Sequence, residues 1–257
     1  MIPPGRSGEF VARMEDVLDL YHRPFDPRRP LVCIDEVPKQ LVGETRQPVP
    51  AQPGRPARYD YEYRRCGVAN LFMVSQPLIG WRHVRVTDRR TARDFGELLG
   101  WLAEELFPEA TRVVLVVDNL NTHGPGSLYE AFVPARARRI ARRLEWHYTP
   151  KHGSWLNVAE CELAALSRQC LDRRIGSVGH LRRAVSAWEE ERNERGVGVN
   201  WRFATADARI KLRRLYPSDS GGVAGTGGGP TDEAQGECGG VGASPSASRR
   251  AGGPRGE

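Results

Sequence analysis

Apolar residues run without interruption over Val113–Val117, and Asp118 follows them directly. Four of these five residues are valine, which is typical of a strand buried on both faces in the middle of a sheet. The run Leu31–Ile34 is similar and is followed by Asp35. Because α/β folds place their sites at the edge of the sheet where strands end, these two aspartates are the first candidate site residues.

The rest of the pattern predicts strands and helices in alternation. Strands are predicted at 31–37, 61–65, 68–76, 81–87, 112–118 and 146–148, and helices at 10–21, 91–107, 135–144, 155–171 and 177–195. Thr91 is a favourable capping residue for the second of these helices. Four prolines between Gln47 and Pro56 predict an exposed connection.

The composition changes at Ser218. Glycine, serine and proline dominate from there to the end, and apolar residues almost vanish. Such a segment cannot bury enough surface to offset its chain entropy, so it is predicted to be disordered. The expected division is an N-terminal linker helix (1–30), an α/β core domain (31–176), a C-terminal helical extension (177–217) and the disordered tail (218–257).

The charge is unevenly spread along the 257 residues, which are enough for one good core. The formal net charge is +6, and residues 219–257 contribute −2 from three arginines and five acids, which leaves +8 on residues 1–218. The sequence pI is near 9.3. A basic folded part fits a polyanionic partner such as DNA, and it equally fits an ordinary protein from an arginine-rich proteome.

The five cysteines are odd in number and form no Cys-x-x-Cys pair. They are predicted to be buried free thiols, not disulfides or zinc ligands. The N-terminus lacks the apolar core of a signal peptide, and no run reaches the roughly 20 apolar residues that span a bilayer. We therefore expect a soluble, cytoplasmic protein without a membrane partner.

A third candidate carboxylate lies in the predicted helix 155–171. Glu160 and Glu162 flank its apolar stripe on opposite sides and about equally far from the centre, so periodicity does not choose between them. Asn157 and Glu160 also have the spacing of a capping box, in which the glutamate would serve the start of the helix. Two aspartates at strand ends and a helical glutamate suggest a cage for divalent cations, because Mg²⁺ prefers oxygen ligands.

Five strings between about Phe10 and Pro217 carry a resemblance to a known family. They are MEDVLDLYHRPFDPRRPLVCIDE, YEYRRCGVANLFM, VVLVVDNLNTHGPGSLYEAF, EWHYTPKHGSWLNVAECEL and WRFATADARIKLRRLYP. The chain resembles the catalytic part of DDE transposases, specifically the bacterial insertion-sequence branch of the mariner superfamily. The resemblance implies a ribonuclease-H-like fold, a mixed central sheet flanked by helices. With 61–65 and 68–76 counted as one strand, the predicted order from residue 31 on is three strands, helix, strand, helix, strand and helix, which fits the same fold.

The resemblance implies that Asp35, Asp118 and Glu160 form the acidic triad of the family. It implies two Mg²⁺ or Mn²⁺ ions there, one to activate an attacking water or 3′-hydroxyl and one to stabilise the leaving oxygen. The implied activity is nicking of transposon ends and strand transfer into target DNA, by a homo-oligomer assembled on DNA. Full-length relatives carry helix-turn-helix modules ahead of this domain. The chain therefore resembles a catalytic half, from a split reading frame with an upstream helix-turn-helix partner chain, from a truncated copy or from a mis-assigned start. Another ribonuclease-H-fold nuclease and an inactive DNA-binding remnant remain as alternatives.

Several polar residues near the triad are expected to support its carboxylates. They are Asn119, His123 and Asn157. Ordinary turn chemistry explains Asn119 equally well, and His123 would either contact DNA or steady its loop. Glu36 is expected to point away from Asp35, because side chains alternate along a strand.

Four basic residues are expected to contact the DNA backbone, namely Lys151, His152, Arg89 and Arg90. Lys151 and His152 precede the helix that carries Glu160, where a positive charge would neutralise a phosphate. For all four, the alternative is an ordinary solvated side chain. The two arginines are the weaker candidates, because surface arginines are common.

Overall fold

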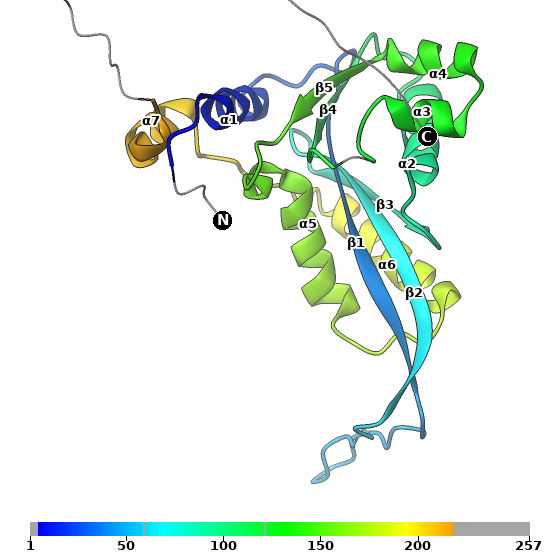
Figure 1. Cartoon of the computed structure of the whole chain (residues 1–257). Helices are drawn as coiled ribbons and strands as arrows, with labels where there is room; N and C mark the ends of the chain where they lie inside the picture. The colour runs from blue at the N-terminus through cyan, green and yellow to red at the C-terminus, as the bar shows by residue number, and fades with distance from the viewer. Residues whose placement is uncertain (1–4, 59, 121, 218–257) are drawn as a thin grey trace, which may run out of the picture. The chain divides into compact units, whose positions relative to one another are not determined.

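The computed structural model of the chain describes residues 5–58, 60–120 and 122–217 (Figure 1). Residue contacts divide the chain into a first unit that ends at Ser218 and a second unit, 219–257. The fold is that of the first unit, and the predicted tail, 218–257, lies outside the described residues. Among the helices of the described part, none is both long and apolar enough to cross a membrane.

A five-stranded mixed sheet forms the centre of the fold. Its strands are β1 Leu31–Glu44, β2 Tyr63–Gln76, β3 Trp81–Thr87, β4 Val113–Val117 and β5 Leu144–Tyr148. In space they lie in the order β3-β2-β1-β4-β5, with β1–β2 and β2–β3 antiparallel and β4 and β5 parallel to β1. This is the arrangement of a ribonuclease-H-like fold, so the predicted fold class is confirmed.

Helices cover both faces of the sheet (Figure 1). They are α1 Gly8–Tyr21, α2 Ala92–Trp101, α3 Gly126–Ala131, α4 Pro134–Ala141, α5 Val158–Leu166, α6 Val178–Glu194 and α7 Thr205–Lys211. Short π turns prolong α2 to Leu106 and α5 to Leu171, and 3-10 turns lie at Ser154–Leu156 and Arg213–Leu215. Side chains of α1, α5 and α6 share one apolar core, and those of α2, α3 and α4 share the other.

The side chains of β1 and β4 alternate between these two cores. The parallel register pairs Cys33 with Val116, and both side chains face the core that includes α5. The residues of the other face are Val32, Ile34, Val113, Leu115 and Val117. All of β4 is buried, as expected for a strand with helices above and below.

The structure also contains elements that the sequence pattern did not show. β1 continues beyond its predicted end at Val37, because its second half pairs with β2 in a long hairpin. The predicted strands 61–65 and 68–76 form a single strand, in which Gly67 has a φ of 107°. Helices α3 and α7 are additional, and both are too short to show a helical period.

The cysteines agree with the prediction only in part. The four described cysteines are all free thiols, as expected. Cys33 and Cys170 are buried and Cys66 is half-buried, but Cys161 is exposed on α5, so the prediction of burial is wrong for it. The fifth, Cys238, lies outside the described residues.

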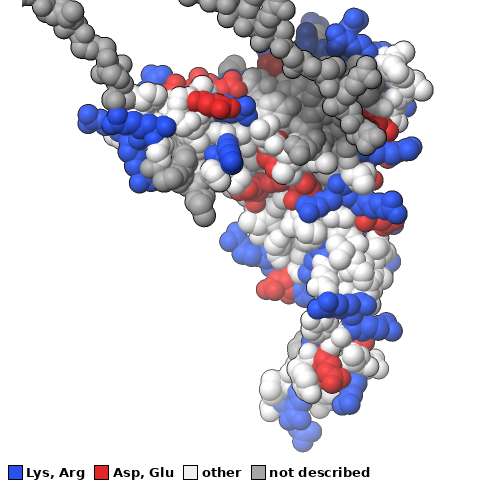
Figure 2. Space-filling view, viewed as in Figure 1, with Lys and Arg blue, Asp and Glu red and all other residues white. Residues whose placement is uncertain are grey.

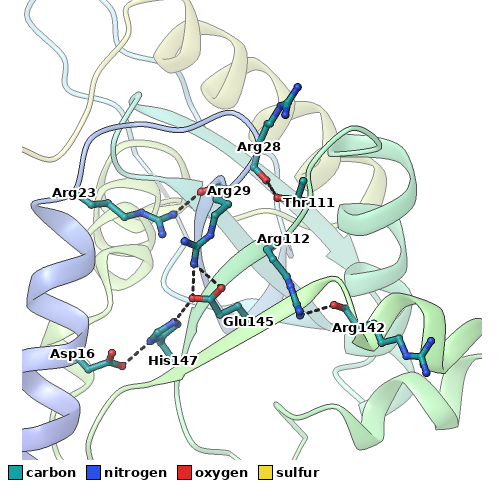
Figure 3. A network of polar contacts seen from close by, with 9 residues as sticks. All are labelled: Asp16, Arg23, Arg28, Arg29, Thr111, Arg112, Arg142, Glu145 and His147. Carbon is teal, nitrogen blue, oxygen red and sulfur yellow. Dashed lines mark hydrogen bonds and ion pairs between the residues drawn. The ribbon is translucent and has the colours of Figure 1, made fainter.

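A polar network attaches α1 and the loop after it to the edge of the sheet where β5 begins (Figure 3). His147 of β5 contacts Asp16 of α1 at 2.7 Å and Glu145 at 3.3 Å. Glu145 also accepts two hydrogen bonds from Arg29, at 2.9 and 2.8 Å. Since Arg29 precedes β1 directly, these contacts help to hold the start of β1 close to the parallel strands.

Candidate active site

The two candidate aspartates lie level with each other across β1 and the end of β4. The parallel register ends with the pair Cys33 and Val116, and Asp35 and Asp118 each follow this pair by two residues. Because side chains alternate along strands, both carboxylates start from the face that α5 covers. Asp35 itself lies inside β1, where it pairs with Met73 of β2, so the prediction that it ends its strand is wrong. It is β4 that ends here.

Helix α5 brings Glu160 to these aspartates through its N-terminal residue. The Asn157 side chain accepts a hydrogen bond from the Ala159 N–H at 3.1 Å and donates one to the Ile34 carbonyl at 2.9 Å. The first bond caps α5, and the second attaches this end of the helix to β1 beside Asp35. Asn157 is buried, so neither bond competes with solvent.

The capping-box alternative for Glu160 is not formed. In a capping box, the Glu160 carboxylate would accept a hydrogen bond from the backbone N–H of Asn157. That N–H donates instead to the carbonyl of Ser154 at 2.7 Å. The side chain of Glu160 is half-buried and is not used by the cap.

Glu162 forms buried ion pairs with two arginines. Its carboxylate lies 3.1 Å from Nε of Arg82 on β3 and 3.0 Å from Nε of Arg192 on α6. Glu162 is 2% exposed and Arg82 is 1% exposed. Such a pair locks α5 against β3 and α6, and thereby turns Glu160 toward the other side of the helix.

Burial and nearby charges both act on the ionisation of Asp35. Burial raises the pKa of Asp35, the N–H of Glu36 at 2.8 Å lowers it, and the charges of Asp118, Glu36 and Glu160 raise it again, to about 7. Neighbouring negative charges oppose ionisation of one another. A hard cation among these oxygen atoms would remove that repulsion, so the donor set fits Mg²⁺ or Mn²⁺. Among the described residues, no group of three or more His, Cys, Asp or Glu side chains is arranged so that it could hold a metal ion as it stands.

His123 connects Asp118 to a fourth carboxylate, that of Glu36. The buried imidazole contacts the Asp118 carboxylate through Nδ1, and its Nε2 lies 2.8 Å from Oε2 of Glu36. The Phe95 ring packs on it at 4.4 Å. Burial alone would lower the pKa of His123, but its hydrogen bonds to Asp118 and Glu36 raise it to about 9. His123 is therefore a buried cation that steadies its loop and orients Asp118.

Glu36 is the residue whose role the sequence did not indicate. It does point away from Asp35, as alternation predicts, toward the face of the sheet that carries Phe95. There it meets His123, and Arg90 lies 3.7 Å from its other oxygen. The signal in the sequence is a second acid directly after Asp35, but nothing local identifies its partner.

The other predicted contact residues fall into two places. Lys151 and His152 are exposed in the loop 150–153, called here the Lys151 loop, and they line a hollow together with Asn119 and the start of α1. His152 has a φ of 66°, which is uncommon for a residue with a side chain. Arg89 and Arg90 instead follow β3, on the Glu36 side, and both are exposed. The Lys151 loop therefore lines the same hollow as Asn119, the residue after Asp118. Arg90 is connected to the site only indirectly, by its ion pair with Glu36.

Comparisons with known proteins found a matching family and several similar solved structures. Residues 30–182 match the model of a family described as DDE superfamily endonuclease. The chain is similar to the Mos1 transposase paired-end complex with left transposon end, at 19% identity over 77% of this chain and 60% of that chain, with a TM-score of 0.48. It is similar to the mariner Mos1 paired-end complex with Mg, at 17% identity over 85% of this chain and 66% of that chain, also with a TM-score of 0.48. The chain thus spans about 60% of the length of the first of these structures. No curated protein matched the chain.

Proposed function

This chain belongs to the DDE superfamily endonucleases, and from that premise we propose that it is the metal-dependent catalytic domain of a transposase from the bacterial insertion-sequence branch of the mariner superfamily. The proposed reaction is hydrolytic nicking at a transposon end, followed by attack of the freed 3′-hydroxyl on target DNA. The observation that carries the proposal is the placement of Asp35 on β1, of Asp118 at the end of the neighbouring parallel strand β4, and of Glu160 in the first turn of α5, whose capping residue is hydrogen-bonded to β1 at Ile34.

In this proposal Asp35, Asp118 and Glu160 would hold two Mg²⁺ or Mn²⁺ ions. Such ions, when bound, supply positive charge to the attacking and leaving oxygens of a phosphoryl transfer. His123 keeps Asp118 oriented by a charged hydrogen bond on the side away from the reaction. Asn157 keeps α5 attached to β1, so that Glu160 stays beside Asp35.

The proposed substrate is DNA, and the proposed working form is a homo-oligomer assembled on it in the bacterial cytoplasm. Carboxylates position phosphates but do not read bases. We therefore propose that recognition of the transposon end comes from helix-turn-helix modules outside residues 5–217. The basic charge expected on residues 1–218 supports binding of the DNA backbone.

The test is a strand-transfer assay with transposon-end duplex, labelled target DNA, and either Mg²⁺ or Mn²⁺. The wild-type chain is expected to give nicks that leave a 3′-hydroxyl and, with a helix-turn-helix partner, joined products. Asp118→Asn and Glu160→Gln are expected to give neither. A suitable control is Asp172→Asn, since that exposed carboxylate lies after α5 and outside the proposed triad. Cleavage without any joined product, or cleavage of an RNA:DNA hybrid only, would favour another ribonuclease-H-fold nuclease.

A further inference from the structure

A cluster of basic side chains lies on residues 202–214, beyond the residues 30–182 that match the family. Its basic members are Arg202, Arg209, Lys211, Arg213 and Arg214. All five are exposed, and Figure 2 shows basic side chains gathered over α7. Asp207 is the only acid in this stretch, so the segment, called here the basic segment, has a net charge of +4, from five positive charges and one negative.

The basic segment is a fixed part of the surface, because α1 holds it. Arg209 forms two hydrogen bonds to the carboxylate of Glu15 on α1, at 2.9 and 3.0 Å. Thr205 donates to Asp19 of the same helix at 2.6 Å. The positive charges are therefore presented at defined positions, which lowers the entropy lost when a ligand binds them.

Three of the guanidinium groups have no partner of opposite charge. Arg209 and Lys211 are paired with carboxylates within the chain. Within residues 5–58, 60–120 and 122–217, however, no carboxylate lies at ion-pair distance from Arg202, Arg213 or Arg214. An exposed and unpaired guanidinium is well suited to bind a phosphate with two hydrogen bonds.

The basic segment borders the hollow beside the active site. Phe203 packs edge-on against Trp155, with ring centroids 6.1 Å apart, and Trp155 follows the Lys151 loop closely in the chain. Ser7 lines the hollow with that loop, and its N–H donates to the carbonyl of Leu215 at 3.1 Å. Two contacts therefore connect the segment to the hollow, whose lining includes Arg13 and Lys151 together with the acid Glu9.

We propose that the basic segment and the Lys151 loop together bind the backbone phosphates of the DNA duplex next to the cleaved position. This inference rests on the proposed function, since that function brings a phosphate to Asp35, Asp118 and Glu160. Duplex DNA carries one charge for about every 1.7 Å of its axis, so a duplex held at the carboxylates exposes many phosphates to the neighbouring surface. Contacts of this kind fix the orientation of the duplex without reading its sequence.

The test is a salt titration of binding to a short labelled duplex, measured in the presence of EDTA so that no cleavage occurs. The variant Arg202→Gln/Arg213→Gln/Arg214→Gln removes the three unpaired charges. If each arginine neutralises one phosphate, the slope of log K against log salt falls by about 2.7 in magnitude, at about 0.9 for each contact. Affinity at about 0.1 M salt is expected to fall tenfold or more. The corresponding triple lysine variant keeps the charges and is expected to restore most of the slope.

The matched control is Arg28→Gln/Arg138→Gln/Arg142→Gln, which removes the same charge elsewhere. These three arginines are exposed and lie before β1 and on or just after α4, and Figure 3 shows the Arg28 and Arg142 side chains pointing away from the polar network. The control is expected to keep the wild-type slope. The proposed surface would be overturned if the segment glutamine variant and the control variant lost the same amount of slope, or if neither lost any.

Nicking of the same duplex in Mn²⁺ separates this inference from the proposed function. If the wild type nicks DNA while the segment glutamine variant and the control variant bind it equally well, the proposed DNA-binding surface is wrong and the proposed function stands. If the wild type does not nick but the segment variant alone loses binding, the surface stands as a DNA contact and the catalytic proposal fails. Thermal unfolding of all variants is expected to match the wild type, because the six arginines have no carboxylate partners among the described residues.

Discussion

Replacing Glu162 by glutamine is expected to destabilise the protein strongly, although the change keeps the size of the side chain. Glu162 is the only carboxylate between Arg82 and Arg192 in the described ion pairs, at 3.1 and 3.0 Å. Arg82 is 1% exposed, so water cannot solvate its guanidinium group once the negative charge of Glu162 is removed. Its remaining hydrogen-bond partners would be neutral, the Asn193 side chain and the Val197 carbonyl, and the nearby charge of Glu189 makes no hydrogen bond to it among the described contacts.

The magnitude follows from this burial. Removing one partner of a buried ion pair costs about 3–5 kcal/mol, because an uncompensated charge remains. The lower end applies here, since glutamine still offers one carbonyl oxygen and the Arg192 side chain is 16% exposed. A loss of about 3 kcal/mol is a large part of the 5–15 kcal/mol that holds a typical domain folded.

The measurement is urea unfolding followed by tryptophan fluorescence and circular dichroism. With a slope of about 2–3 kcal/mol per molar urea, the expected loss lowers the midpoint by about 1 M. Glu160→Gln is the matched control, because it makes the same chemical change two residues away on α5. Glu160 is half-buried and faces like charges, so its replacement is expected to change the free energy of unfolding by less than about 0.5 kcal/mol.

The same pair of variants separates stability from activity. Glu160→Gln is expected to abolish nicking in a stable protein, whereas Glu162→Gln is expected to keep measurable nicking at temperatures where it stays folded. Two results would refute the reasoning. One is a Glu162→Gln variant as stable as the wild type, and the other is a Glu160→Gln variant that is equally destabilised.

Three further predictions concern the metal, the helix cap and the packing. Mg²⁺ or Mn²⁺ is expected to raise the melting temperature, and Asp118→Asn to reduce that rise; an identical shift in both proteins would mean that the aspartate is not a ligand. Asn157→Ala removes the cap of α5 and its bond to β1, and is expected to cost about 1–2 kcal/mol in urea unfolding and to slow nicking, whereas unchanged stability would contradict the role of the cap. At Gly96 a Cβ would lie 2.2 Å from the Ser127 carbonyl oxygen, so Gly96→Ala is expected to cost about 1–3 kcal/mol. The control Gly126→Ala meets nothing within 4 Å and is expected to stay near the wild type in the same thermal unfolding experiment.

The central strand and its helices could be predicted because their signal is local. β4 is a short apolar run with a charged residue after it, and burial on both faces follows from that composition alone. In the predicted helix 10–21 the apolar residues recur at helical spacing, and these same residues are buried in α1, namely Phe10, Met14, Val17, Leu18 and Tyr21. In both cases the period of the hydrophobic residues identifies the element and the face that it buries, without knowledge of any partner.

The second half of β1 was not predictable in this way. Past Val37 its residues are partly exposed and lack a clear alternation, so the strand exists there because β2 supplies hydrogen-bond partners. Pairing between distant segments is a property of the folded chain, and the periodicity of one segment does not contain it. For this reason Asp35 was expected at a strand end but lies inside a strand.

The candidate site shows the same division. Sequence pattern alone singled out Asp35 and Asp118, because an acid after an apolar run is conspicuous, but it left Glu160 and Glu162 equivalent. The family resemblance favoured Glu160, and the tertiary structure adds a physical difference by placing Arg82 and Arg192 against Glu162 and Asp35 near Glu160. The physical reason is that the state of a carboxylate depends on charges within a few ångströms, and in a folded chain those charges come from segments that are far apart in the sequence.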